Sequence, residues 1–79
     1  MKLTILPFGA LTDSVSPAGF LLENAQIATV SQLHAHLLAQ YPAIAAQRFR
    51  YAVNQELVDE QHPLQDGDEV ALLPPFSGG

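Results

Sequence analysis

The last residues of the chain join a conformationally restricted Pro-Pro segment to a Gly-Gly end without side chains, a combination that suits a reactive terminus. Pro74 and Pro75 favour an extended, polyproline-like path, and Gly78 and Gly79 follow without side chains. Gly-Gly leaves the backbone free to turn and gives it the thinnest cross-section available to a polypeptide. Residues 74–79 can reach roughly 20 Å beyond a sheet. Such an end can enter a narrow tunnel and present the α-carboxylate of Gly79 to the active site of another protein.

A frayed end is the alternative for this segment, because glycine is common in disordered termini. The preceding run Val70-Ala71-Leu72-Leu73 favours the reactive terminus, since it predicts a buried strand that leads directly into the Pro-Pro spacer. We therefore expect a folded domain over residues 1–73 and an extended tail over residues 74–79.

The composition excludes several classes of protein. A chain of 79 residues makes one domain, and it contains no cysteine, so disulfides, thiolate metal sites and a cysteine nucleophile are excluded. Any sulfur that the protein handles must come from outside. The net charge of −5 disfavours nucleic acid and suits a partner with a basic docking surface. No apolar run could span a bilayer and no signal-peptide pattern opens the chain, so we expect a cytoplasmic protein.

The first strand should run from residue 2 to residue 8, with Leu3 and Ile5 on one face. Pro7 cannot donate to a ladder, so strand pairing should end or have an edge there. Residues 9–19 are rich in turn-forming residues and should hold at most a short helical turn.

Thr29 opens the clearest helix of the sequence. A threonine three residues before Gln32 predicts a capping box. Apolar residues then recur at helical spacing, which predicts one stripe covering a sheet: Val30, Leu33, Leu37, Leu38 and Tyr41. Pro42 should end the helix, and residues 43–47 can add one more turn.

The remaining segments predict strands. Residues 20–23 should pair antiparallel with the first strand, and residues 50–54 and 56–58 should flank a turn. Asp66-Gly67 is a turn signal before the final strand. Two strands before one helix and further strands after it predict an α+β fold, a mixed sheet with the helix on one face.

Other polar side chains offer little chemistry. His34 and His36 point to different sides of the helix and His62 lies far along the chain, so we expect solvent-exposed structural histidines and no metal site. Three acidic residues fit a solvated turn better than a calcium loop, with an acidic docking patch as the alternative: Asp66, Asp68 and Glu69. No activated nucleophile or phosphate loop is visible, so an autonomous enzyme is not expected.

The face of the sheet away from the helix should be apolar. If Val70 and Leu72 face the helix, alternate residues of that strand face away, beside apolar residues of neighbouring strands. We expect a partner interface here, with a second core layer covered by a loop as the alternative. The residues expected in this interface are Leu6, Phe8, Leu57, Ala71 and Leu73.

Three blocks, in this order and spacing, resemble the MoaD-type sulfur carriers, the small subunits of molybdopterin synthase in the MoaD/ThiS ubiquitin-like family. They are Val53-Asn54-Gln55, Asp66-Gly67-Asp68-Glu69-Val70-Ala71 and Pro74-Pro75-Phe76-Ser77-Gly78-Gly79. The resemblance spans essentially the whole chain and implies the ubiquitin-like β-grasp fold. The chain departs from many relatives in having Ala10-Leu11-Thr12-Asp13, without a basic residue, near the end of the first strand.

The resemblance also implies a function. A ubiquitin-activating-like adenylyltransferase of the MoeB type would adenylate Gly79, and a sulfur donor would convert it to a thiocarboxylate. The tail would then enter a large subunit of the MoaE type, in a heterotetramer, and give sulfur to cyclic pyranopterin monophosphate to form the molybdopterin dithiolene. Adenylate and thiocarboxylate are covalent intermediates, and no permanently bound cofactor is expected. Gly78 and Ser77 would supply clearance, while Pro74, Pro75 and Phe76 would guide the tail.

Three alternatives remain open from the sequence. The chain can be a sulfur carrier for another product, such as the thiazole of thiamine or a thiolated nucleoside. It can be a ubiquitin-like modifier that joins Gly79 to lysines through isopeptide bonds. It can also be a plain binding module, in which case removing Gly78 and Gly79 would change nothing.

Overall fold

The computed structural model describes residues 1–24 and 26–75. Four of the predicted tail residues, Phe76, Ser77, Gly78 and Gly79, lie outside the described residues. Pro74 and Pro75 lie within them, so the structure describes the place where the tail begins.

Five strands form one mixed sheet, as the sequence predicted. They are β1 (Lys2–Pro7), β2 (Phe20–Glu23), β3 (Arg50–Val53), β4 (Glu56–Val58) and β5 (Glu69–Leu73). Their order is β2-β1-β5-β3-β4, in which β1 and β5 are parallel and the other neighbours are antiparallel. The strand that precedes the tail therefore lies in the middle of the sheet.

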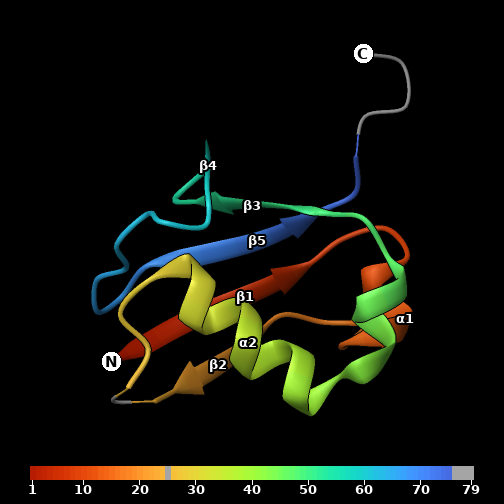
Figure 1. Ribbon diagram of the computed structural model, residues 1–79, viewed down its shortest axis with the longest axis horizontal. Coiled ribbons are helices and arrows are strands. Elements are labelled where there is room, and N and C mark those ends of the chain that lie inside the picture. Colours follow the sequence, from red (N-terminus) through yellow and green to blue (C-terminus); the bar gives the residue numbers. More distant parts are fainter. Residues whose placement is uncertain (25, 76–79) are drawn as a thin grey trace.

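The helices lie on one face and at one end of this sheet (Figure 1). Helix α2 (Val30–Gln40) crosses one face, and Pro42 begins the 3₁₀ helix η1 (Pro42–Ala46), which contacts the short helix α1 (Leu11–Ser14). The α+β, ubiquitin-like β-grasp prediction is thus confirmed. In the described ranges, no helix has the length and apolar character needed to cross a membrane.

The core lies between α2 and the sheet. The alternation predicted for the first strand is confirmed, because Leu3 and Ile5 are buried and the intervening Thr4 is half-buried. The side chains that fill the core from the helix and the central strands are almost fully enclosed: Leu3, Ile5, Val30, Leu33, Leu37, Val70 and Leu72. Burying side chains of this size stabilises the fold by about 1.5–3 kcal/mol each.

Pro7 lies at the end of β1 without breaking a hydrogen bond. The amide of Phe8 donates to the Leu72 carbonyl of β5 at 3.0 Å. Since successive amides of a strand point to opposite sides, the Pro7 nitrogen faces the β2 side. Pairing of β1 with β2 has already ended at Ile5, so the missing N–H removes no ladder bond.

The capping box of α2 forms with one difference from the prediction. The Thr29 hydroxyl accepts a hydrogen bond from the Gln32 amide at 3.3 Å, as expected for an N-cap. The side-chain oxygen of Gln32 accepts from the Ala28 amide at 2.6 Å, one residue before the N-cap. The reciprocal bond therefore fixes the chain entering the helix as well as the helix end.

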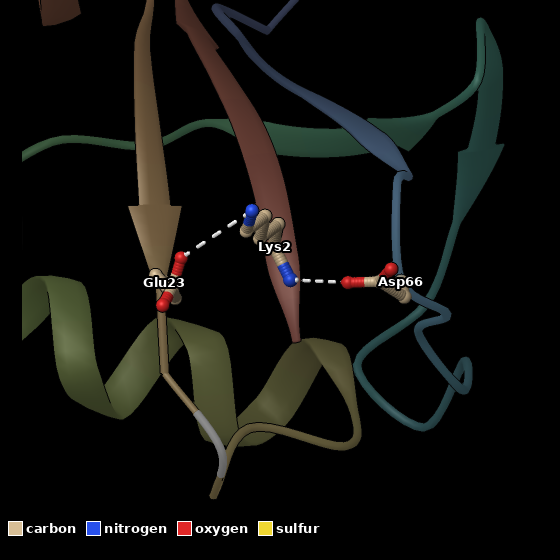
Figure 2. A network of polar contacts seen from close by, with 3 residues as sticks. All are labelled: Lys2, Glu23 and Asp66. Atoms are coloured by element: carbon tan, nitrogen blue, oxygen red, sulfur yellow. Dashed lines mark hydrogen bonds and ion pairs between the residues drawn. The ribbon is translucent and has the colours of Figure 1, made fainter.

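The start of β1 is held by acidic side chains (Figure 2). The backbone amide of Lys2 donates to a carboxylate oxygen of Asp66 at 2.6 Å. The Lys2 ammonium lies 3.9 Å from a Glu23 carboxylate oxygen on β2, and both side chains are largely exposed. Such an exposed pair contributes little to stability, whereas the Asp66 bond joins the turn before β5 to the neighbouring strand.

The acidic turn is more ordered than the solvated turn expected from the sequence. One carboxylate oxygen of Asp68 accepts from the Gln65 amide at 2.8 Å, and the other accepts from the Asn54 side chain at 2.9 Å. The Asn54 oxygen in turn accepts from the Glu69 amide at 3.0 Å. Asn54 and Gln55 have φ of 50° and 71°, which are typical of a type I′ hairpin turn. The turn therefore anchors the β3–β4 hairpin to β5.

Candidate functional site

The tail begins at a fixed point of the fold. Strand β5 ends at the end of the sheet opposite to the amino-terminal end of β1, and the chain leaves the sheet there (Figure 1). Pro74 and Pro75 are exposed. Gly9, with φ of +60°, lies against Pro74, because a Cβ at residue 9 would be only 3.1 Å from the Pro74 Cγ. The loop after β1 therefore supports the base of the tail.

Strand register places the predicted interface residues of three strands in one row. Leu6 pairs with Ala71, Ala71 pairs with Ala52, and Ala52 pairs with Leu57. Residues that are directly paired point to the same face of a sheet. Val70 and Leu72 are buried against the helix side, so this row lies on the opposite face, as the sequence predicted.

A second row lies nearer to the tail. Leu73 pairs with Arg50, and Phe8 follows the pair formed by Pro7 and Leu72. Phe8 and Leu57 are 45% and 44% exposed. The described residues therefore leave these side chains in contact with solvent, and the alternative of a second core layer covered by a loop is not supported.

Two residues of this face were missed by the sequence analysis. Leu21 of β2 is 75% exposed and pairs with Thr4, which shares a face with Leu6. Ala52 of β3 lies in the middle of the first row but is itself buried, with 4% exposure, so it contributes to the shape of the face more than to its exposed surface. The alternation of side-chain directions within each strand could have indicated these positions. Only the strand register, however, shows that residues of separate segments lie side by side on one face. We define the apolar face by seven residues: Leu6, Phe8, Leu21, Ala52, Leu57, Ala71 and Leu73.

The prediction that the three histidines are solvent-exposed is wrong. All three are half-buried. The Nδ1 atom of His34 lies 2.8 Å from the Tyr51 hydroxyl, and the Nδ1 atom of His36 lies 3.4 Å from the Asn24 side-chain nitrogen. Tyr51 of β3 and Asn24, which follows β2, are the partners of these two rings, and helical spacing alone does not reveal them. Within residues 1–24 and 26–75, no group of three or more His, Asp or Glu side chains could hold a metal ion.

Tyr51 is the titratable group most changed by its surroundings. Burial raises its pKa above the ordinary value, and the negative charge of Glu60 raises it further. Its hydroxyl therefore stays protonated and can donate to His34. The ring also contacts Phe49 edge to face, with centroids 5.2 Å apart.

The fold and the site define a class of protein: a ubiquitin-like β-grasp domain whose central strand leads into exposed Pro74 and Pro75 beside an apolar face. Solved structures share this architecture, and one from Pyrococcus furiosus superposes with a TM-score of 0.86 at 20% identity, over 96% of this chain and 99% of that chain. A model of the ThiS family matches residues 5–79, and the chain belongs to this family. The resemblance stated from the sequence is confirmed.

Relatives of known role cover most of the chain. It is 46% identical over 59 residues to the molybdopterin synthase sulfur carrier subunit of Escherichia coli K12, covering 70% of this chain and 73% of the relative. The subunit of the same name from Chlamydomonas reinhardtii is 32% identical over the full length of both chains. A solved complex of subunits 1 and 2 of the molybdopterin-converting factor from Helicobacter pylori contains a chain that is 26% identical, with a TM-score of 0.63 and full coverage of both chains.

Proposed function

We propose that this chain is a sulfur carrier and the small subunit of a molybdopterin synthase, with the α-carboxylate of Gly79 as its reactive group. The observation that carries the proposal is the course of β5. This central strand leads to exposed Pro74 and Pro75 at one end of the sheet, beside an apolar face with exposed side chains. The family match that continues to Gly79, and the curated relatives, support the same reading.

Activation must come first, because a carboxylate is both a poor electrophile and a poor source of sulfur. In the proposed route, a ubiquitin-activating-like adenylyltransferase of the MoeB type joins the Gly79 carboxylate to the α-phosphate of ATP and releases pyrophosphate. A sulfur donor then attacks the carbonyl of the glycyl adenylate, and AMP leaves. With a persulfide donor, an external thiol reduces the S–S bond of the resulting acyl disulfide, which leaves a terminal thiocarboxylate whose soft anionic sulfur is a good nucleophile at neutral pH. The chain has no cysteine of its own to intercept this chemistry.

Transfer takes place in the large subunit, of the MoaE type. The thiocarboxylate sulfur forms a bond to a side-chain carbon of cyclic pyranopterin monophosphate as a carbon–oxygen bond at that carbon breaks. Water then cleaves the acyl carbon–sulfur bond, which returns Gly79 to the carboxylate and leaves sulfur on the pterin. Two such transfers form the dithiolene. Cationic groups of the large subunit stabilise the tail anion and the tetrahedral intermediate. Gly78 and Ser77 give clearance in the tunnel, and Pro75 and Phe76 direct the tail into it.

The apolar face is proposed to bind both partners in turn. Its exposed side chains lie beside the start of the tail, so a protein seated on it would receive the tail at a fixed distance. Because the activating enzyme and the large subunit would need the same tail, they bind one at a time. Apolar contacts with a charged rim suit such exchanging interfaces.

Reconstituted transfer tests the proposal. The chain, an activating enzyme, ATP and a sulfur donor are mixed with a large subunit and cyclic pyranopterin monophosphate, and molybdopterin is measured. Gly78→Val, or one extra residue after Gly79, should abolish transfer without changing the circular dichroism spectrum. Ala46→Val, an equal kind of change at an exposed site on η1, should transfer normally. Normal transfer by the Gly78→Val and extended chains would contradict the tunnel geometry.

The same assay separates the other outcomes. A thiocarboxylate that forms but leaves the pterin unchanged would assign the chain to another sulfur acceptor. Isopeptide-linked adducts in place of a thiocarboxylate would assign it to protein modification. Full activity after removal of Gly78 and Gly79 would reduce the chain to a binding module.

A further inference from the structure

A pocket of about 470 Å³ lies at the outer edge of the sheet. It is formed where β4, the last strand in the sheet order, meets the start of α2. Its lining combines rings, aliphatic side chains and charges: His34, Phe49, Arg50, Tyr51, Leu57, Val58, Asp59 and Glu60. The proposed sulfur chemistry uses none of the ring or acidic side chains in this set.

The inner wall of the pocket is aromatic and well ordered. Tyr51 is buried, and its hydroxyl is held by the Nδ1 atom of His34 at 2.8 Å. The rings of His34 and Phe49 both meet the Tyr51 ring at steep angles, with centroids 5.9 Å and 5.2 Å away. Phe49 and the adjacent Val58 are half-buried, so apolar surface remains open to an incoming side chain. Aromatic surfaces of this kind attract cations as well as aliphatic groups.

The rim of the pocket is acidic and fixed. The Glu60 carbonyl accepts from the Ser31 amide at 2.7 Å, and the His62 carbonyl accepts from the Val30 amide at 3.0 Å, so this segment is fastened to the start of α2. The Asp59 side chain accepts from the Gln61 amide at 2.9 Å. Glu60 lines the pocket, and its negative charge adds to the effect of burial in raising the pKa of Tyr51.

Arg50, the arginine among the lining residues, does not neutralise Asp59 and Glu60 inside the pocket. Arg50 precedes Tyr51 in β3, and neighbouring residues of a strand point to opposite faces. Since Tyr51 is directed to the helix side, Arg50 is directed to the side of the apolar face and contributes only to the rim. Among the described residues, no ion pair joins Arg50 to Asp59 or Glu60.

The outer edge of β4 gives the pocket an approach for a polypeptide. In the described chain β4 pairs with β3 alone, so its other edge carries unpaired backbone groups that can bind an added strand. Leu57 belongs both to the pocket and to the apolar face, which makes the two surfaces continuous.

We propose that this edge pocket receives a lysine or arginine side chain from a partner polypeptide that lies along β4. The aliphatic stem packs on Phe49 and Val58, and the cationic end lies between the aromatic wall and Glu60. The net charge of −5 favours a basic partner over a neutral one. This inference does not depend on the chemistry proposed for Gly79.

Two capped pentapeptides test the pocket by NMR on the ¹⁵N-labelled chain. The basic peptide is Ser-Val-Lys-Val-Ser, and its neutral match replaces lysine by norleucine. The basic peptide should shift the amide signals of His34, Phe49, Tyr51 and Val58, while the norleucine peptide should bind more weakly. Equal shifts from both peptides, or shifts that map elsewhere, would overturn the proposal.

A pair of variants separates the pocket from the overall charge. Glu60→Gln removes the carboxylate while keeping its shape, and no described hydrogen bond uses that carboxylate. It should weaken binding of the basic peptide by about two- to fivefold, the range of a partly exposed ion pair. Asp13→Asn makes the same charge change on α1, away from the pocket, and should leave the affinity unchanged. Equal weakening by both variants would mean that net charge alone attracts the peptide.

Discussion

At the scale of single residues, a few positions decide where the tail starts and how the sheet meets the helix. Gly9 adopts φ of +60° and lies against Pro74, so it combines a conformation that favours glycine with a close contact. Tyr51 joins the sheet to α2 through His34 and is the described residue with a clearly raised pKa. Both residues lead to predictions about individual side chains.

Gly9→Ala should disturb the tail. The left-handed conformation costs a residue with a side chain about 1–2 kcal/mol, and the new Cβ would lie 3.1 Å from Pro74. We expect lower stability in urea and slower sulfur transfer. Gly67→Ala is the control, because residue 67 also has positive φ but its Cβ would meet nothing within 4 Å. It should lose stability yet transfer sulfur at the normal rate, and equally slow transfer by both would contradict the role of Gly9.

Tyr51→Phe should change how stability depends on pH. Because the folded-state pKa of Tyr51 is raised, the unfolded chain releases this proton near pH 10 while the folded protein keeps it. Above about pH 10, the Tyr51 hydroxyl should therefore lower the unfolding free energy of the wild type by up to about 1.4 kcal/mol for each pH unit.

Urea unfolding of the two proteins between pH 8 and pH 11, values chosen to bracket the ordinary tyrosine pKa of about 10, measures this effect. At the lowest pH of this range, the wild type should be more stable than Tyr51→Phe by about 1 kcal/mol, because its hydroxyl makes the hydrogen bond with His34. The advantage should shrink as pH rises. A constant difference across the range would contradict the raised pKa.

At the scale of elements, β5 divides two tasks between its faces. Leu72 is fully buried in the core, while Leu73 is half-buried on the apolar face. The strand therefore holds the sheet together and presents part of the proposed docking surface at the place where the tail begins.

Alanine substitutions at these neighbouring leucines should separate the two tasks. Leu72→Ala should lower the free energy of unfolding by about 2–5 kcal/mol through the cavity it leaves. Leu73→Ala should cost about 1 kcal/mol or less but weaken binding to the large subunit by about fivefold or more, as expected for a contributing interface residue. Urea unfolding and calorimetric titration measure the two effects. Unchanged binding by Leu73→Ala would remove this residue from the interface.

The sequence predicted the elements better than it predicted the contacts between them. Periodicity and the Thr29 cap identified α2, and alternation separated the two faces of β1 and β5, because these signals are local. Leu21 and Ala52 were not assigned to the apolar face, since that assignment depends on register between distant segments. The half-buried histidines and the edge pocket were missed for the same reason.

At the scale of the whole molecule, the start of the tail and the single lysine lie apart. The amino-terminal end of β1, with the single lysine Lys2, is at the end of the sheet opposite to the exit of the tail (Figure 1). The Lys2 ammonium is also near the Glu23 carboxylate. The fold itself therefore places no lysine beside the start of the tail, an arrangement that suits a carrier whose activated terminus must reach a partner before it reacts.

The central claim, that Gly79 carries sulfur, is tested most directly by the intact mass of the chain purified from cells that also make its natural partners. The account predicts a mass increase equal to one oxygen replaced by sulfur, located at Gly79 by fragmentation. It also predicts that the increase disappears after incubation with the large subunit and cyclic pyranopterin monophosphate. An unmodified mass that persists after incubation with the activating enzyme, ATP and a sulfur donor would contradict the account.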